Sequence, residues 1–206
     1  MATLEGHELF GKTVVDVTNG ESVGSVADIL VDSAAGHVAG LVVSRGNRLS
    51  GRQRDEVIPA EAVQAVGRDA VTVKRVVSEP VQAPEKTAAG GTLARASAIQ
   101  GRRIVTTSGR EVGRLGDVVL DCDTGSVAGY TIRAGPLEGA LGRRDPGAEY
   151  VRADANIRFG EDVVVVPDGT VMGRAEGGSR NATVSVRWTG VGQGSRPAAE
   201  PSEGRP

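Results

Sequence analysis

Two pairs of aspartates are the first residues in this chain that could do chemistry. Asp28 and Asp32 lie four residues apart, and the same spacing recurs at Asp117 and Asp121. On a helix this spacing would place two carboxylates on one face, where they could act together in acid/base work. The residues between them, such as Ile29–Val31, are instead typical of a strand, and four residues along a strand span roughly 13 Å. We therefore expect hydrogen bonding at turns and strand ends rather than a catalytic pair.

Other reactive side chains are isolated. The segment 121–125 starts like a calcium loop, but its glycine comes one position early and the twelfth position is Ile132. The flanking aspartates of Cys122 disfavour its thiolate form. His7 and His37 are too few for a metal site unless carboxylates join them, and we expect both to be solvated. The sequence thus predicts no catalytic residue, no cofactor and no metal.

Arginines crowd two loops that could meet an anionic partner such as RNA or an acidic protein face. The candidate partner-binding residues are Arg45, Arg48, Arg52, Arg54, Arg133, Arg143 and Arg144, with Trp188 added from the C-terminal region. Asp55 and Glu56 dilute the charge of the first loop, and aromatic residues, which could stack on bases, make up only 2% of the chain. A solvated loop is the simpler interpretation.

These residues belong to an internal repeat. Residues 23–40 read VGSVADILVDSAAGHVAG and residues 112–129 read VGRLGDVVLDCDTGSVAG, with eight identities at a spacing of 89. A second block, 67–73, matches 160–166. A period of this length predicts two copies of one small domain. The identical residues are Val, Gly, Asp and Ala, which shape turns and cores, so the repeat predicts architecture more than chemistry.

Alternating apolar residues and turn signals predict a β-meander in each copy. In copy one we expect strands over 13–17, 23–31, 38–43 and 70–77, with a short helical turn over 60–66. An Asp followed by a Gly is typical of a hairpin, because Asp bonds nearby amides and Gly tolerates a positive φ. The residues assigned to turns are Asp32, Gly36, Gly40, Asp121, Gly125 and Gly129.

The composition divides the chain into two domains, a linker and a tail. We place domain one at 6–78, a flexible linker rich in Pro and Gly at 79–97, and domain two at 98–168. The remaining residues, 169–206, form a Gly-rich tail that is expected to be disordered from about residue 190. Within the tail, the alternation over 182–188 predicts a short strand that could dock on a barrel edge.

Overall composition limits the partners and the compartment. A formal net charge of −2 gives no global attraction to nucleic acid or to an anionic membrane. No apolar run approaches the roughly 20 residues that insertion into a membrane needs, and no secretory signal is present. A single cysteine fits a reducing cytoplasm. Units of about 70 residues are marginally stable alone, so we expect the barrels to pack together or to form a homodimer.

The order of the repeated residues carries a family likeness. The pattern in copy one is Gly24, Val26, Asp28, an apolar triplet, Asp32, Gly36, Val38, Gly40 and a later Gly-x-Asp-x-Val. Both copies carry it, so the chain resembles a tandem PRC-barrel protein. That family includes the cytoplasmic barrel of the photosynthetic reaction-centre H subunit and the C-terminal barrel of a ribosome-maturation factor. The resemblance implies an all-β fold of two small, partly open β-barrels on a flexible linker, with a mostly disordered C-terminal tail.

The resemblance also implies protein binding without catalysis by the barrel. We therefore expect a non-enzymatic cytoplasmic module for protein interaction or assembly, whose protein partners the sequence does not identify. The alternative is a ribosome- or RNA-associated assembly factor that uses the Arg loops. An enzyme is the third hypothesis, but no nucleophile, base and orienting group recur at matched spacing.

Overall fold

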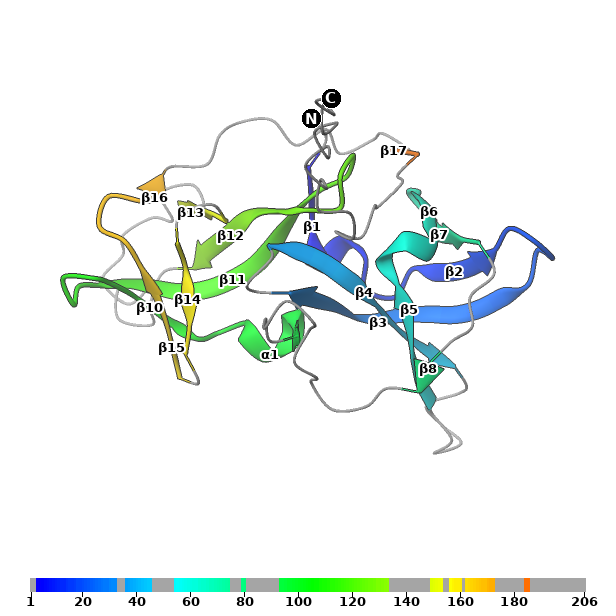
Figure 1. The fold of residues 1–206 in the computed structure, drawn as a ribbon, viewed down its shortest axis with the longest axis horizontal. Coiled ribbons are helices and arrows are strands. Elements are labelled where there is room, and N and C mark those ends of the chain that lie inside the picture. Colours follow the sequence, from blue (N-terminus) through cyan, green and yellow to red (C-terminus); the bar gives the residue numbers. More distant parts are fainter. Residues whose placement is uncertain are drawn as a thin grey trace, which may run out of the picture.

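A computed structural model describes residues 3–32, 36–45, 54–74, 79–80, 93–133, 149–153, 156–160, 162–172 and 184–185. Of these residues, 64% lie in strands and 8% in helices. The strands form two sheets, which Figure 1 shows side by side. The all-β, two-unit fold expected from the sequence is confirmed. Most of the expected linker, at 81–92, and the part of the tail expected to be disordered, from about residue 190, lie outside the described residues.

Copy one builds the first sheet from strands with alternating burial. In one of them Val71 and Val73 are buried while Ala70 and Thr72 are partly exposed, as one apolar face requires. The elements are β2 (Thr13–Asp16), β3 (Ser22–Asp32), β4 (His37–Arg45), β5 (Arg54–Pro59), the 3₁₀ turn η3 (Ala60–Ala62), β6 (Val63–Val66), β7 (Ala70–Val73) and β8 (Glu79–Pro80). The strand order is β17-β6-β7-β2-β3-β4-β5-β8, in which only β2 and β7 are parallel.

Copy two repeats this topology. Its elements are β10 (Arg103–Thr106), β11 (Glu111–Asp121), β12 (Val127–Arg133), β13 (Glu149–Arg152), β14 (Arg158–Phe159), β15 (Val163–Val166) and β16 (Val171–Met172). The order is β14-β15-β10-β11-β12-β13-β16, with β10 and β15 parallel. Among the described strands neither path returns to its first member, so each copy is an open barrel.

The two copies exchange their first strands. β1 (Thr3–Glu5), at the start of copy one, pairs with β11 of copy two, and β9 (Leu93–Arg95), at the start of copy two, pairs with β3 of copy one. A short helical segment follows each exchanged strand, η1 (Gly6–Glu8) after β1 and α1 (Ala96–Ile99) after β9. Figure 1 shows β1 and α1 between the two sheets. Each barrel therefore includes a strand that comes from the other copy.

One hydrophobic core runs through both copies. The buried apolar residues form a single cluster that includes Leu9, Ile29 and Leu41 of copy one together with Ile99 and Leu120 of copy two. Leu9 and Ile99, which follow and end the two short helical segments, are 0% and 2% exposed. Because small domains bury too little apolar surface alone, sharing a core stabilises both copies. The two copies interlock through the exchanged strands and this common core.

Three local features differ from the sequence expectations or extend them. The helical turn expected over 60–66 is helical only at Ala60–Ala62, because residues 63–66 pair with β7 as β6. Residues 93–95, assigned to the linker, form β9. In the tail, β17 (Val184–Ser185) pairs with β6. Among the described residues no helix is long and apolar enough to cross a membrane.

Candidate functional site at the junction of the two copies

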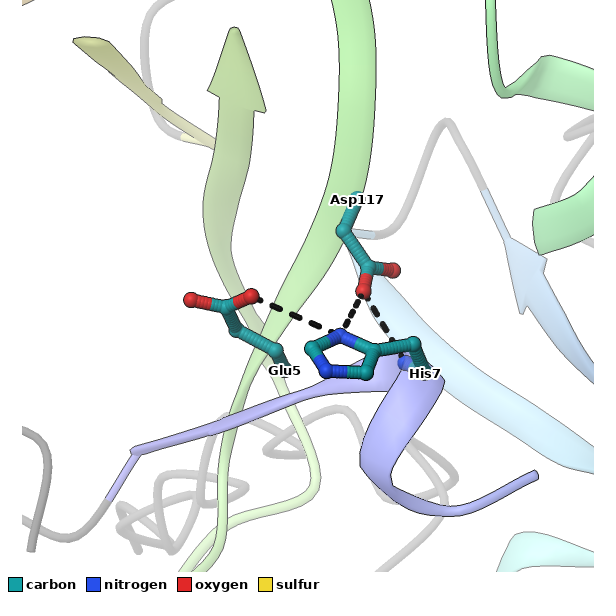
Figure 2. A group of neighbouring side chains, drawn as sticks. All are labelled: Glu5, His7 and Asp117. Atoms are coloured by element: carbon teal, nitrogen blue, oxygen red, sulfur yellow. Dashed lines mark hydrogen bonds and ion pairs between the residues drawn. The ribbon is translucent and has the colours of Figure 1, made fainter. Parts of the chain in front are cut away.

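Asp117 of β11 binds the N-terminal segment of copy one. Its Oδ2 accepts hydrogen bonds from the His7 backbone N–H at 2.9 Å and lies 2.7 Å from His7 Nδ1. Its Oδ1 accepts from the Val118 N–H at 2.8 Å, and Gln100 Nε2 lies 3.4 Å away. Asp117 is only 2% exposed, so these donors replace the water that its carboxylate has lost. We call the contacts between Asp117 and His7 the His7 clasp (Figure 2).

Asp28 of β3 makes the equivalent contacts with the N-terminal segment of copy two. Its Oδ1 accepts from the Ile29 N–H at 2.8 Å and from the Ser97 N–H at 3.2 Å. Its Oδ2 accepts a short hydrogen bond from the Ser97 hydroxyl. Asp28 is 3% exposed. We call these contacts between Asp28 and Ser97 the Ser97 clasp. The repeated Asp28 and Asp117 are therefore not turn residues, because each fixes a segment of the other copy.

The repeated hairpin turns also meet at the junction. The Val38 N–H donates to the Gly125 carbonyl at 3.0 Å, and the Val127 N–H donates to the Gly36 carbonyl at 2.9 Å. Gly36 and Gly125 have φ values of 66° and 71°, in the left-handed region that suits glycine. Several of the residues identical in the two copies thus serve the contact between the copies.

A histidine and two carboxylates gather at the His7 clasp. Glu5 Oε2 lies 3.4 Å from His7 Nδ1, and Figure 2 shows Glu5 to the left of the imidazole and Asp117 above it. The donor atoms of Glu5, His7 and Asp117 all lie within 4.8 Å of one another. His7, which we expected to be solvated, contacts both carboxylates, and its side chain is 58% exposed. Sequence reasoning missed this group because Asp117 lies 110 residues from His7 and only the strand exchange joins them.

The structure places few of the candidate arginines. Arg45 is engaged within copy one, since its Nε donates to the Val23 carbonyl at 2.8 Å and lies 3.2 Å from Glu56 Oε2. Arg133 ends β12 with an exposed side chain, and Arg54 begins β5. The other candidates lie outside the described residues, namely Arg48, Arg52, Arg143, Arg144 and Trp188.

The residues assigned to turns fall into two groups. Asp121 Oδ1 accepts from the N–H groups of Asp123 and Thr124 at 2.8 and 3.0 Å, which is an Asx turn, so the calcium-like loop uses its first carboxylate on its own backbone. Gly40 and Gly129 lie inside β4 and β12 instead of in turns. A Cβ on Gly40 would come within 2.6 Å of the Ile58 carbonyl oxygen, and one on Gly129 within 2.3 Å of that of Val151. These two glycines are needed for close strand approach.

Cys122 is buried and has no nucleophilic setting. Burial is the main cause that raises the pKa of its thiol to about 11, and the nearby Asp121 and Asp123 carboxylates raise it further. The thiolate is therefore scarce at neutral pH.

A comparison with protein-family models gives the architecture its name. The PRC-barrel domain model matches residues 1–79 and again residues 91–172. A search among curated proteins found no match. The two matched segments cover both copies and include the exchanged strands β1 and β9. Since the matches span most of the sequence, the chain belongs to the PRC-barrel domain family and carries that domain twice.

Proposed function

We propose that the chain is a non-enzymatic cytoplasmic module that assembles with other proteins by accepting an extended segment at a sheet edge. PRC-barrel domains are often found in protein-interaction modules, which supports the class of function. The free, buried thiol of Cys122 is compatible with a reducing compartment.

Strand addition is the observation that carries this proposal. β17 adds to β6 at the outer edge of the copy-one sheet, with Val184 opposite Val66 and Ser185 opposite Ala65. Val184 of β17 lies 118 residues after its partner Val66 of β6 (184 − 66), so this edge accepts a segment that is distant in sequence. An edge strand presents unpaired N–H and C=O groups that pair readily with an extended chain.

The matching edge of copy two is β14. β14 is the terminal strand of its sheet, and among the described strands only β15 pairs with it. Phe159 of β14 packs against Tyr130 with ring centroids 5.3 Å apart, which holds the strand on the core. Arg158 is exposed. We infer that an extended segment of a partner protein adds beside β14, as β17 does beside β6.

The shared core makes the two copies one binding unit. Partners at the two edges would meet surfaces held in a fixed relation, because each barrel contains a strand of the other copy. A fixed relation between two binding surfaces raises the effective concentration for a partner that meets both.

Site-specific photo-crosslinking in cells would test this proposal. A photo-crosslinking amino acid at Arg158, on the edge strand, should capture a specific protein. The matched control is Arg103, which is also exposed and lies in the same sheet, but in β10 between β15 and β11. Equal capture from both positions, or capture of no protein from Arg158, would contradict strand addition at β14.

RNA capture in the same experiment would favour the alternative assembly factor. The engagement of Arg45 with Val23 and Glu56 leaves less of its charge for phosphate. If RNA were the partner, binding would fall steeply with salt and would weaken when Arg45, Arg48, Arg52 and Arg54 are replaced by Ala.

A further inference from the structure

We propose that Glu5, His7 and Asp117 form a site for one divalent transition-metal ion, with Zn²⁺ as its probe, that links the two copies. Glu5 and His7 come from the exchanged segment of copy one, and Asp117 comes from β11 of copy two (Figure 2). The inference does not depend on the partner proposed above.

The three donor atoms lie within 4.8 Å of one another, close enough to share one ion. Zn²⁺ binds imidazole nitrogen and carboxylate oxygen at about 2.0–2.2 Å, so two donors of a tetrahedral ion lie about 3.3 Å apart. His7 Nδ1 and Glu5 Oε2 are already 3.4 Å apart. His7 Nδ1 and Asp117 Oδ2 are 2.7 Å apart, a hydrogen-bonding distance that would have to lengthen by about 0.6 Å on metal binding. Small side-chain rotations can supply this change.

The chemistry of the group suits a borderline metal ion. One imidazole and two carboxylates match the ligands that Zn²⁺ and neighbouring transition metals take in proteins. Without metal, the Nδ1 proton of His7 lies between the two carboxylates. A metal ion at Nδ1 would require this proton to move to Nε2, because a ligating imidazole must be neutral with a free lone pair on the bound nitrogen. The exposed imidazole leaves an entry path and room for water as a further ligand.

The buried ligand is already oriented. Asp117 is held by the Val118 and His7 backbone amides as well as by Gln100. Bonds of this kind to a ligating carboxylate fix its direction and strengthen metal binding.

The Ser97 clasp shows that the fold itself does not require these ligands. At the positions that match Glu5 and His7, copy two has Arg95 and Ser97, and the Ser97 hydroxyl alone completes the clasp with Asp28. Arg95 places a cation there, with its Nη1 3.8 Å from Asp55 Oδ2. Since a hydroxyl suffices for the contact with Asp28, the clasp itself does not require the imidazole of copy one, and Glu5 also takes part in a capping box with Glu8 at the start of η1.

Isothermal titration of the full-length, untagged protein with Zn²⁺ after chelator treatment tests the site. We expect one ion per chain. His7→Ser gives copy one the side chain that copy two uses in its clasp, and it should weaken binding at least about tenfold, since even indirect supports of a metal ligand contribute that much. His37→Ser is the matched control and should leave the affinity unchanged.

A gain-of-site variant decides the matter even if His7→Ser folds poorly. Arg95→Glu with Ser97→His installs the same three donors at the Ser97 clasp, and the stoichiometry should rise from one ion to two per chain. Absence of Zn²⁺ binding by the wild-type protein, unchanged affinity of a folded His7→Ser variant, or a stoichiometry that stays at one in the double variant would overturn the proposal.

Discussion

The His7 and Ser97 clasps occupy the same place in the two copies but close it with different chemistry. In both, a buried aspartate accepts the backbone N–H of the second residue in a short helical segment from the other copy. The remaining donor is an imidazole in one clasp and a hydroxyl in the other. The aspartate is thus the shared element, because in both clasps its carboxylate accepts a backbone N–H of the other copy. The residue it meets is free to differ, and that freedom gives copy one its histidine and carboxylate group.

Replacing Asp117 or Asp28, the two buried clasp aspartates, should lower the free energy of unfolding more than any other change considered below. Asp117→Ala leaves the His7 and Val118 amides without their acceptor, and we expect a loss of about 3 kcal/mol in the free energy of unfolding, since each bond to a charged group contributes substantially. Asp28→Ala should cost somewhat less, because Asp28 has fewer donors. Urea denaturation measures both.

Amide hydrogen exchange provides the control, because it distinguishes an aspartate that contacts the other copy from one that stabilises only a turn of its own copy. Asp28→Ala should speed exchange at the Ser97 amide of copy two, and Asp117→Ala at the His7 amide of copy one. If the amide hydrogen-exchange rates changed only within the mutated copy, the swapped pairing of β1 and β9 would be contradicted.

Alanine substitutions at the strand glycines Gly40 and Gly129 should give the next largest loss of stability. Gly129→Ala places a Cβ against both Tyr150 and the Val151 carbonyl, so we expect a loss of about 2 kcal/mol from overpacking. Gly40→Ala has more room and should cost less. Thermal unfolding of the two variants measures the difference, and Gly36→Ala is a useful comparison because its Cβ would meet nothing within 4 Å and its cost would come from φ alone.

The two clasp donors should differ in their contributions. Ser97→Ala removes the hydroxyl that donates to Asp28 Oδ2, so we expect a loss of about 1.5 kcal/mol. His7→Ala should cost about 0.5–1 kcal/mol, because Asp117 Oδ2 keeps the His7 amide and the imidazole is largely exposed. Chemical denaturation would measure the two losses of stability. A greater loss for His7→Ala than for Ser97→Ala would contradict the expected difference between the clasps.

The smallest expected effect on stability is at Asp168. Its carboxylate binds the turn that follows β10 in copy two, and this contact distinguishes that turn from the one that follows β2 in copy one. Hydrogen bonds from Ser108 and Thr107 lower the pKa of Asp168 to about 2. Because the folded pKa lies below the unfolded value, this stabilisation is present above about pH 4 and disappears as the pH falls towards 2.

Ser108→Ala with Thr107→Val should raise the pKa of Asp168 towards 3.8, which a carboxyl NMR titration would measure. The stability of the exposed turn should change little. In copy one the corresponding turn uses Asp16, whose Oδ1 accepts the Thr18 N–H at 2.8 Å. Asp16→Ala is therefore the variant of copy one that matches the double variant of the turn in copy two. An unchanged Asp168 pKa in the double variant would contradict the role of the hydroxyls.

The order of the strands within each copy could be predicted because local sequence encodes it. The alternation of residues such as Val71 and Val73 indicates a face of a sheet, and glycines such as Gly36 and Gly125 indicate the hairpins. The sequence predicts turns at the strand glycines Gly40 and Gly129, since a glycine needed for close approach has the same local sequence signal as one needed for a turn.

The sequence by itself determined that the chain is a duplication, that each copy is a small β-rich unit of the PRC-barrel type, and that Asp28 and Asp117 are too far from Asp32 and Asp121 to work as pairs. Only the tertiary structure decided what these aspartates do. The exchange of β1 and β9 joins residues separated by 110 positions at one clasp and by 69 at the other. No periodicity extends over such distances, because strand partners are selected by the burial of a common core and not by neighbouring sequence.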